Sequence, residues 1–444
     1  MNLQSAPSRG HLLRVLGVGF GIAVTIGNTI GAGIFRSAGL IADQLPNVWL
    51  FLGVWALGGL FALIASFSVA ELGTMIPRSG GHYVFAHHAL GDYPGFVIGW
   101  TDWLSNAGSS AAVAIVIGEY LGLLVPPLVP SKIGIACAVV ILFAVVQWRG
   151  IRAGSEVQNV TTVLKGLIFV ALVIACFIYP QRAPATHPVP ILPQGTALLV
   201  AIVLAMQAVI YTCDGWAGII YFSEETKDPG RDVPRSMFLG TLAVIAIYLL
   251  ISAATVKVMP ISEVRGDVFA IGSVARFMWG AVGDKLLPVV MIVSMLSAIN
   301  AYQLMTCRIL YSMSLDGLFT RRAARVNAGG TPDVALLIST VAAVLFIVGG
   351  QKFEVVAGIM ALFFTCNYIA DLVSVYVMRW KEPARARPYR AWGYPWTTGI
   401  ALVGYSAFLI AAVKADWSAV GRWWLVILAA SYPVFWVTQR LRHL

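Results

Sequence analysis

Residues 27–35 read Gly27-Asn28-Thr29-Ile30-Gly31-Ala32-Gly33-Ile34-Phe35, and they interrupt an apolar stretch that covers residues 14–41. Glycine lets a backbone leave helical geometry at little cost. Inside lipid, such a break is tolerated only where protein or a water-filled cavity satisfies the freed backbone groups. A second apolar stretch, residues 195–222, is interrupted in the same way by Tyr211-Thr212-Cys213-Asp214-Gly215-Trp216-Ala217-Gly218. We therefore expect each stretch to form a broken membrane helix.

The composition of the whole chain is that of a membrane protein. Hydrophobic residues make up 59% of the 444 residues and charged residues only 11%, whereas a soluble domain carries roughly 25% charged residues. A spanning helix needs about 20 mostly apolar residues. The sequence therefore predicts an all-α polytopic membrane protein with twelve transmembrane helices. The predicted spans are 14–41, 47–71, 94–123, 132–148, 157–180, 195–222, 237–259, 285–314, 333–350, 353–379, 397–415 and 421–439.

The basic residues fall mainly in alternate loops between these spans. If both termini are cytoplasmic, the cytoplasmic loops hold about twice as many lysines and arginines as the outer loops, which agrees with the positive-inside rule. This placement accounts for the net charge of +10 without a nucleic-acid partner. In the longest outer loop, residues 257–285, we expect short helices that lie across the outer face.

The two interrupted stretches are the first and the sixth of the predicted spans. Transporters built from inverted repeats carry a discontinuous helix at the same position in each repeat. Free N–H groups at the start of an outer half-helix can hold an anion, and freed carbonyls can hold a cation. An amino acid offers both charges on one carbon. For the first break, Gly27 and Gly31 also fit a small-xxx-small packing motif, so helix packing remains an alternative.

Motifs spread over most of the chain resemble the amino acid–polyamine–organocation superfamily, and within it the L-amino-acid transporter branch with its bacterial relatives. Together they form a specific set, although each alone is weak. They are Ile30-Gly31-Ala32-Gly33-Ile34-Phe35, Pro77-Arg78-Ser79-Gly80-Gly81-His82-Tyr83, Asp214-Gly215-Trp216 with residues 224–234, and Arg387-Pro388-Tyr389-Arg390 with Gly393-Tyr394-Pro395.

The resemblance implies a leucine-transporter fold of five plus five inverted helices with two helices added. Residues 1–13 then form a cytoplasmic N-terminal tail, 14–180 the first inverted repeat, 195–379 the second, and 397–439 the last two helices. It also implies a bacterial inner (cytoplasmic) membrane location. The implied function is transport of an amino-acid substrate by alternating access, with no cofactor and no metal.

The resemblance further implies roles for residues at the two breaks. The substrate carboxylate would bind the backbone around Ile30, Gly31, Ala32 and Gly33. The substrate ammonium would bind carbonyls near Tyr211, Thr212, Asp214 and Gly215. Tyr211 also matches the position of an aromatic gate over the substrate.

Lys165 lies within the fifth predicted span. A lysine at mid-span costs roughly 2.5–3.5 kcal/mol on insertion scales, so it should face the interior and have partners. It resembles the lysine that bacterial relatives place where sodium-coupled members hold a sodium ion. We expect its ammonium to brace the first break, which argues against sodium coupling. The alternative is snorkelling to the inner interface.

Asp214 adds an ionisable group to the second break, where animal members of the branch often carry Gly-Gly-Trp instead of Asp-Gly-Trp. It can attract the substrate ammonium, take up a proton during transport, or cap the broken helix. Three more spans contain polar groups. Asp102 and Asp371 with Asn367 are ionisable or amide groups within spans, and Ser297 and Asn300 either line a cavity or join helices by hydrogen bonds.

The leading prediction is a carrier that exchanges small neutral L-amino acids without sodium. Proton-coupled import, transport of cationic amino acids or polyamines, and an amino-acid sensor remain alternatives. No nucleophile motif or phosphate loop favours an enzyme. The eukaryotic light subunits carry a cysteine between helices three and four that links a heavy chain. Residues 125–131 contain none, so we expect no disulfide-linked heavy chain.

Overall fold

The computed structural model describes residues 11–31, 33–188, 191–267, 269–350, 353–415 and 421–442. Within these ranges the chain is helical, and its extended pairing is a single parallel bridge between Leu16 and Thr226. The helices are α1 (Val18–Thr29), α2 (Gly33–Gln44), α3 (Val48–Met75), α4 (His82–Leu90), α5 (Asp92–Leu124), η1 (Pro126–Ser131), α6 (Lys132–Trp148), α7 (Ile151–Ile178), α8 (Thr196–Thr212), η2 (Gly218–Glu225), α9 (Pro229–Val258), α10 (Ile261–Val264), α11 (Ala270–Trp279), α12 (Ala281–Leu315), η3 (Arg321–Ala324), α13 (Asp333–Gly350), α14 (Phe353–Lys381), α15 (Trp396–Ala415) and α16 (Arg422–Arg442).

Eight of the described helices are long and apolar enough to cross a membrane, and α1 with α2 adds a ninth candidate as one bent pair. The eight are α3, α5, α7, α9, α12, α14 and α15 together with η1 joined to α6. Two further apolar helices, α8 and α13, are shorter than the roughly 20 residues that a straight span requires. The chain is thus a multi-pass membrane protein, while the count of twelve spans and the inverted repeat stay predictions.

The first predicted span is broken where the glycine-rich stretch lies. Helix α1 ends at Thr29, and Ile30 adopts an extended conformation with φ −81° and ψ 90°. The Gly31 amide donates to the Thr29 carbonyl at 3.0 Å, which closes a tight turn around Ile30. The axis of α2 then departs from that of α1 by 51°. The break therefore needs only the few residues between Thr29 and Gly33.

The sixth predicted span breaks differently. Helix α8 ends at Thr212, a turn follows, and the chain continues as the 3₁₀-helix η2. Gly215 in the turn has φ +107°, and a Cβ there would stand 2.8 Å from Asn28 Nδ2 and 3.0 Å from the Thr29 nitrogen. Only glycine satisfies both the positive φ and this close approach. The turn at Gly215 thus lets the two breaks touch.

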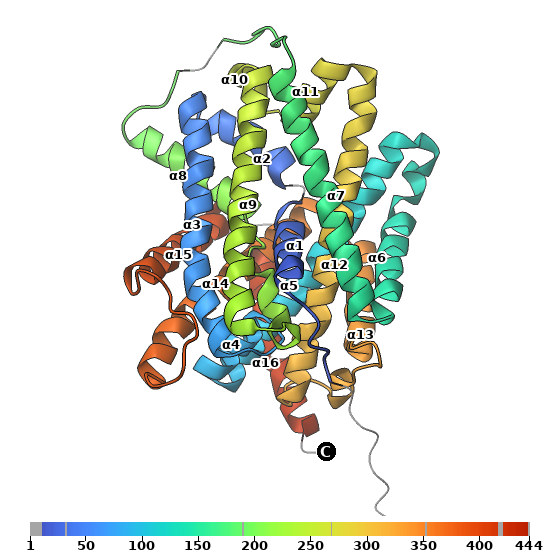
Figure 1. Cartoon of the computed structure of the whole chain (residues 1–444), viewed down its shortest axis with the longest axis vertical. Coiled ribbons are helices and arrows are strands. Elements are labelled where there is room, and N and C mark those ends of the chain that lie inside the picture. Colours follow the sequence, from blue (N-terminus) through green and yellow to red (C-terminus); the bar gives the residue numbers. More distant parts are fainter. Residues whose placement is uncertain are drawn as a thin grey trace, which may run out of the picture.

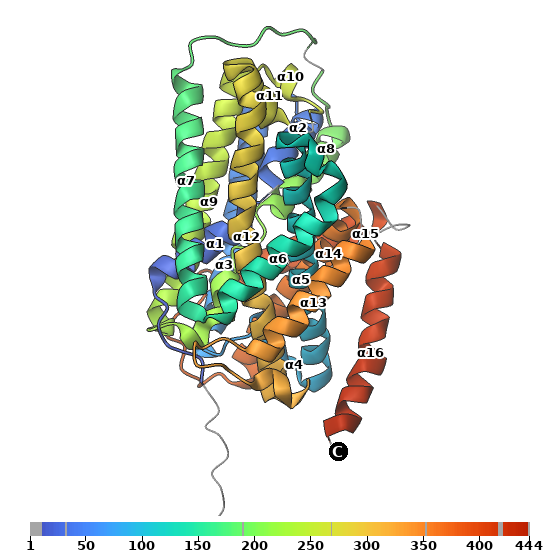
Figure 2. The same ribbon diagram turned by 90° about the vertical axis from the view of Figure 1, so that its right-hand side faces the viewer.

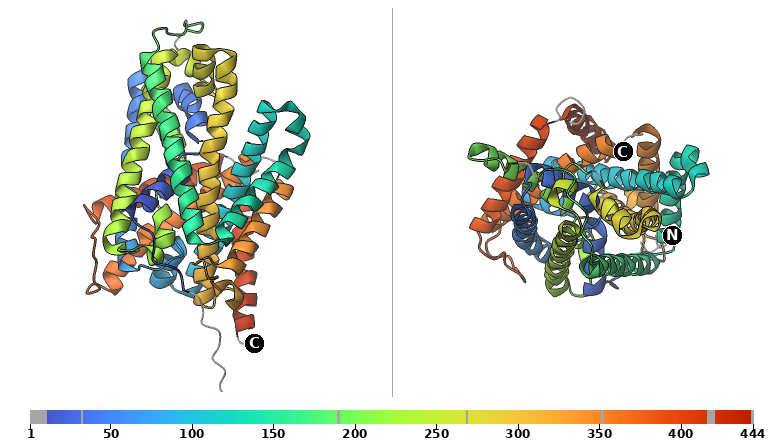
Figure 3. Two further views of the ribbon diagram at one scale, coloured as in Figure 1. Left: turned by 45° about the vertical axis from the view of Figure 1, so that its right-hand side comes forward. Right: turned by 90° about the horizontal axis from the view of Figure 1, so that it is seen from above.

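Helix α5 forms the buried centre of the bundle. Of its most apolar segment, 78% is buried, against 17% for the segment with α6, 22% for α7 and 17% for α15. It packs against α12, α14, α4, α6 and α13. The outer helices expose leucine, valine and isoleucine side chains, as lipid-facing surfaces do. Figures 2 and 3 show α16 at one side of the bundle, apart from α7 and α9.

The described chain begins at the lower end of the molecule in Figure 1, and α16 ends there as well. Helices α10 and α11 lie at the opposite end, where the sequence predicted short helices in the loop 257–285. At the lower end, the Leu16 amide donates to the Glu225 carbonyl at 3.0 Å, and the Lys227 amide donates to the Leu16 carbonyl at 2.9 Å. The segments that precede α1 and follow η2 are thereby joined.

Candidate substrate site at the two helix breaks

The two breaks contact each other directly through backbone and side-chain groups. Asn28 Nδ2 donates to the Gly215 carbonyl at 3.1 Å. Nearby, the hydroxyls of Ser37 on α2 and Thr212 on α8 lie 2.5 Å apart. Residues almost two hundred positions apart in the sequence therefore form one site, and both halves of that site contain irregular backbone.

The backbone around the first break was predicted to bind an anion. Helix α2 begins at Gly33, so its first amides have no partner within the helix and their dipoles point at the break. The Gly31 amide is already bonded to the Thr29 carbonyl. Of the other predicted residues, Ile30 is buried with its carbonyl turned to other partners, and Ala32 lies outside the described residues. The first turn of α2 is accordingly the strongest anion-binding feature here.

The second break supplies acceptors. The Tyr211 carbonyl accepts a bond from the Asp214 amide at 3.3 Å. Asp214 Oδ1 is buried and has no hydrogen-bond partner among the described residues. The hydroxyl of Tyr368 on α14 forms a hydrogen bond with the same carboxylate. Carbonyls and a carboxylate with spare acceptor capacity suit a cation such as an ammonium group.

Tyr248 on α9 joins both breaks, and the sequence analysis missed it. Its hydroxyl lies 2.9 Å from the Thr29 carbonyl and 3.1 Å from the Thr212 carbonyl. The side chain is 1% exposed, and its hydroxyl is a donor for the Thr212 carbonyl and a second donor, beside the Gly31 amide, for the Thr29 carbonyl. A phenolic hydroxyl in the middle of an apolar stretch was the available signal, because a buried tyrosine hydroxyl usually has a partner.

Lys165 on α7 reaches the first break from the other side. Its Nζ donates to the Ile30 carbonyl at 2.6 Å and to the Gly27 carbonyl at 3.1 Å. Ser294 Oγ on α12 donates to the same Ile30 carbonyl at 3.1 Å. Lys165 is 1% exposed, so its ammonium does not snorkel to an interface. A protein cation therefore already occupies the carbonyls that the break frees.

Ser297 and Asn300 join helices in this structure. Asn300 Nδ2 on α12 donates to Gln158 Oε1 at 2.8 Å and to the Gly154 carbonyl at 3.0 Å, both on α7. The Ser297 hydroxyl lies 3.0 Å from the Thr162 hydroxyl, also on α7. The helix-joining alternative thus describes both residues better than a cavity-lining role.

Tyr211, the predicted gate, is 41% exposed at the end of α8. With Asp214, Tyr368 and Thr365 it lines a cavity of about 10 Å³, which is room for about one water molecule. An amino acid fits between the breaks only if the surrounding helices separate. Tyr368, which lines this cavity, stacks on Trp216 with ring centroids 4.8 Å apart.

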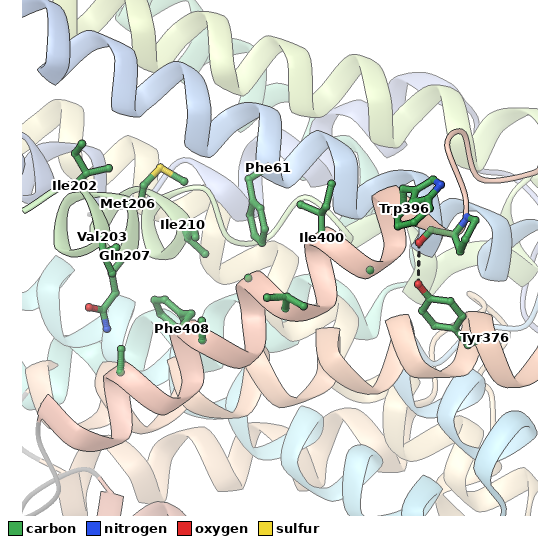
Figure 4. A pocket seen from close by; sticks show the side chains of 16 residues that line it. Phe61, Ile202, Val203, Met206, Gln207, Ile210, Tyr376, Trp396, Ile400 and Phe408 are labelled. Atoms are coloured by element: carbon green, nitrogen blue, oxygen red, sulfur yellow. Dashed lines mark hydrogen bonds between the residues drawn. The ribbon is translucent and has the colours of Figure 1, made fainter. Parts of the chain in front are cut away.

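A larger cavity of about 760 Å³ lies beside this site (Figure 4). It is bordered by α8 and α15, with Phe61 of α3 and Tyr376 of α14 at its edge. Its lining is almost entirely apolar, with Gln207 as one of its few polar side chains. A zwitterion would lose its hydration there without compensating hydrogen bonds, so we do not regard this cavity as the substrate site.

Charged residues close the lower end of the molecule. Arg308 on α12 forms a fully buried ion pair with Glu225 on η2, with Nε–Oε2 at 2.5 Å and Nη2–Oε1 at 2.8 Å. Arg78 binds Asp316 at 3.0 Å. No group of three or more His, Cys, Asp or Glu residues is placed to hold a metal ion within the described ranges.

Comparison with known proteins identifies the family. The Amino acid permease family matches residues 21–437. The chain is 26% identical over 440 residues to the serine/threonine exchanger SteT of Bacillus subtilis. This match covers 96% of the present chain and 97% of the exchanger. It is 27% identical over 409 residues to the b(0,+)-type amino acid transporter 1 of Mus musculus, covering 90% and 82% of the two chains.

The Asc-type amino acid transporter 1 of Mus musculus is 25% identical to it over 407 residues, covering 87% of this chain and 74% of that transporter. The family match extends from α1 into α16 and includes both helix breaks. The chain therefore belongs to the amino acid permease family of the amino acid–polyamine–organocation superfamily, whose members are membrane transporters and not enzymes.

Proposed function

We propose that the protein exchanges small neutral L-amino acids across the membrane by alternating access and without sodium. One observation carries this proposal: the Lys165 ammonium bonds the Gly27 and Ile30 carbonyls of the first break. A sodium ion at these carbonyls would have to displace a buried charge, so the break needs no sodium to hold its shape. The exchange mode is supported by similarity to a protein named a serine/threonine exchanger.

The substrate lies between the two breaks in this proposal. Its carboxylate binds the amides that open α2, around Ile30, Gly31, Ala32 and Gly33. Its ammonium binds carbonyls of Tyr211, Thr212, Asp214 and Gly215, and the Asp214 carboxylate attracts it further. The contact between Asn28 and Gly215 supports this arrangement, because it brings donors and acceptors within the reach of one amino acid.

A small substrate fits the crowding at this site. Tyr211 then acts as a gate that covers the bound amino acid, and Lys165 links its arrival to movement of the first break. The membrane topology proposed with this mechanism has twelve helices, with 14–180 and 195–379 as inverted repeats and 397–439 as added helices. Residues 1–13 form the cytoplasmic tail, and both termini face the cytoplasm of a bacterial cell across its inner membrane.

We further propose that the chain works without a disulfide-linked heavy chain. All five cysteines are unpaired: Cys137, Cys176, Cys213, Cys307 and Cys366. Each lies on or beside a helix of the bundle, and the connection at η1 contains none. A linked partner would need an accessible thiol in such a connection.

Uptake of radiolabelled L-alanine into proteoliposomes tests the exchange. We expect uptake into vesicles loaded with unlabelled L-alanine, and none into empty vesicles, with equal rates in sodium and choline buffers. Uptake into empty vesicles that an inward proton gradient accelerates would instead establish a proton-coupled importer. Uptake of L-lysine in place of L-alanine would point to a carrier of cationic substrates, and binding without flux would point to a sensor.

A further inference from the structure

A buried cluster of acidic and histidine side chains lies next to the candidate substrate site, and the proposed exchange does not use it. His82 at the start of α4 contacts Asp371 on α14, with Nδ1 and Oδ2 2.6 Å apart. Asp102 on α5 is joined to this pair through Tyr221, whose hydroxyl donates to Asp102 Oδ1 and whose ring meets the His82 ring edge-on at 5.7 Å. None of the side chains of His82, Asp102 and Asp371 is more than 2% exposed. Burying ionisable groups within a membrane bundle is costly, and such groups commonly mark functional sites.

Asp102 is the member of the cluster with an incomplete set of partners. Its Oδ1 accepts bonds from the Tyr221 hydroxyl at 2.8 Å and from Asn106 Nδ2 at 2.9 Å. Its Oδ2 is buried and has no partner among the described residues. A buried carboxylate oxygen without a donor is costly, whereas a protonated carboxyl removes the charge. The geometry therefore favours a proton on Asp102.

The surrounding charges do not supply a second cation. Asp102 faces His82, Asp371 and Tyr221, and His82 also faces Asp214. The His82 imidazole is already bonded to Asp371. On the elements packed against the cluster, Arg308 is paired with Glu225 and Arg379 with Glu71. Of the other charged side chains on these elements, His87 lies against Asp316, His88 against Glu382 and Asp333 against Arg325. Asp102 must therefore share the charge of His82 or be neutral.

The cluster also includes a residue of η2, the segment that follows the second break. Tyr221 belongs to η2, the second half of the broken sixth span, and Gly81 with φ +65° leaves room for its ring, which stands 2.2 Å from where a Cβ would be. The His82 ring meets the Tyr368 ring edge-on at 5.2 Å. Tyr368 in turn acts on Asp214 and stacks on Trp216. The Tyr368 side chain thus connects His82 of the cluster to Asp214 of the second break.

We propose that Asp102, with the His82–Asp371 pair and Tyr221, forms a proton-binding site that holds η2 against α5. A charged Asp102 accepts a stronger bond from Tyr221 than a neutral carboxyl does. Loss of the proton therefore tightens the contact between η2 and α5, and gain of the proton loosens it. The site exchanges this proton with water. The inference rests on the proposed exchange, because η2 must leave α5 for the lower side to open.

Infrared difference spectroscopy between acidic and alkaline pH tests the proton site on the purified full chain, without any transport. We expect a protonated-carboxyl band in the wild type that disappears as the pH rises. Asp102→Asn should lose that band, and Tyr221→Phe should keep it because the carboxyl remains. Asp284→Asn, which removes a carboxyl from the exposed pair with Arg276, is the matched control and should keep it too. A band that survives in Asp102→Asn overturns the assignment.

Alanine exchange in proteoliposomes, measured at equal pH on both sides, tests the consequence. The wild-type rate should fall as the pH rises, whereas Asp102→Asn and Tyr221→Phe should exchange at a rate that no longer depends on pH. An Asp102→Asn protein with the wild-type pH profile contradicts the proposal that protonation of Asp102 controls the contact between η2 and α5. If the wild type exchanges nothing but shows the band, the proposed function fails and the proton site stands. If it exchanges but shows no band, the proton site fails alone.

Discussion

Replacing Lys165 by alanine removes an ammonium that bonds two carbonyls of the first break. Two hydrogen bonds are lost, to the Ile30 carbonyl at 2.6 Å and to the Gly27 carbonyl at 3.1 Å. A hydrogen bond to a charged group contributes about 1.5–3 kcal/mol. After the substitution, the Ile30 carbonyl still accepts a bond from Ser294 Oγ. The Gly27 carbonyl has no such second side-chain donor among the hydrogen bonds described above.

If the step that reshapes the first break loses about 2 kcal/mol, the exchange rate falls by about 30-fold, since about 1.4 kcal/mol corresponds to a factor of ten. Ser294→Ala removes one neutral bond of about 1 kcal/mol from a carbonyl that Lys165 still serves, so a fall of about fivefold is expected. Lys285→Ala is the control, because that lysine is exposed at the start of α12. Its rate should equal that of the wild type.

The assay is the initial rate of labelled-alanine exchange per molecule of reconstituted protein. Each variant is first checked for a monodisperse profile in detergent, so that a slow rate is not confused with loss of fold. A Lys165→Ala protein that exchanges at the wild-type rate would refute the role of the ammonium. An equal fall in Lys165→Ala and Lys285→Ala would refute the structural reasoning as well.

Three further outcomes follow from other contacts. Tyr248→Phe deprives both breaks of a buried donor, and at about 1–3 kcal/mol it should slow exchange about 5- to 140-fold without loss of expression; an unchanged rate argues against the bridge. Gly215→Ala should lower the thermal unfolding midpoint, because its φ of +107° and the backbone of the first break leave no room for a Cβ, whereas Gly134→Ala, with open space around it, should not. The hydrogen bond that the His87 ring donates to the Asp316 carboxylate raises the pKa of His87, so its stabilising contribution is complete below the unfolded pKa of about 6.5 and is lost as the pH rises through the folded value. The unfolding midpoint of His87→Gln should therefore vary less with alkaline pH than that of the wild type.

Local sequence patterns were enough to locate the two breaks. Glycines inside an apolar stretch mark a backbone that leaves the helix, and both interruptions fall where the structure ends α1 and α8. The interior position of Lys165 was also predictable, because a charge at mid-span has few other places to go. That Lys165 contacts the first break was expected only from the family resemblance, and its role in transport stays a prediction.

Contacts between distant helices were not predictable in this way. Tyr248 serves carbonyls on two other segments, and His82 finds Asp371 on a helix 289 residues later. A single sequence shows that a polar group lies in a span but not which neighbour it faces. The sequence therefore leaves the role of Asp371 open, and the cluster around it is visible only with the packing of α4, α5 and α14.

The count of spans shows a similar limit. Hydropathy treats residues 195–222 as one span, but the turn after Thr212 shortens α8 and gives the remainder a 3₁₀ conformation. A 3₁₀ segment rises more per residue than an α-helix, so the same stretch can reach as far with a different hydrogen-bond pattern. The length of the apolar stretch alone does not reveal that part of it is a 3₁₀-helix.

The central claim is that the two breaks bind the carboxylate and the ammonium of one amino acid. Ligand-induced stabilisation of the purified protein tests it most directly, because a ligand that binds only the folded state raises the unfolding midpoint. L-Alanine should raise the midpoint in a concentration-dependent manner, whereas propionate, which lacks the ammonium, and alaninamide, which lacks the carboxylate, should not. A midpoint raised as much by either analogue as by L-alanine would contradict the claim.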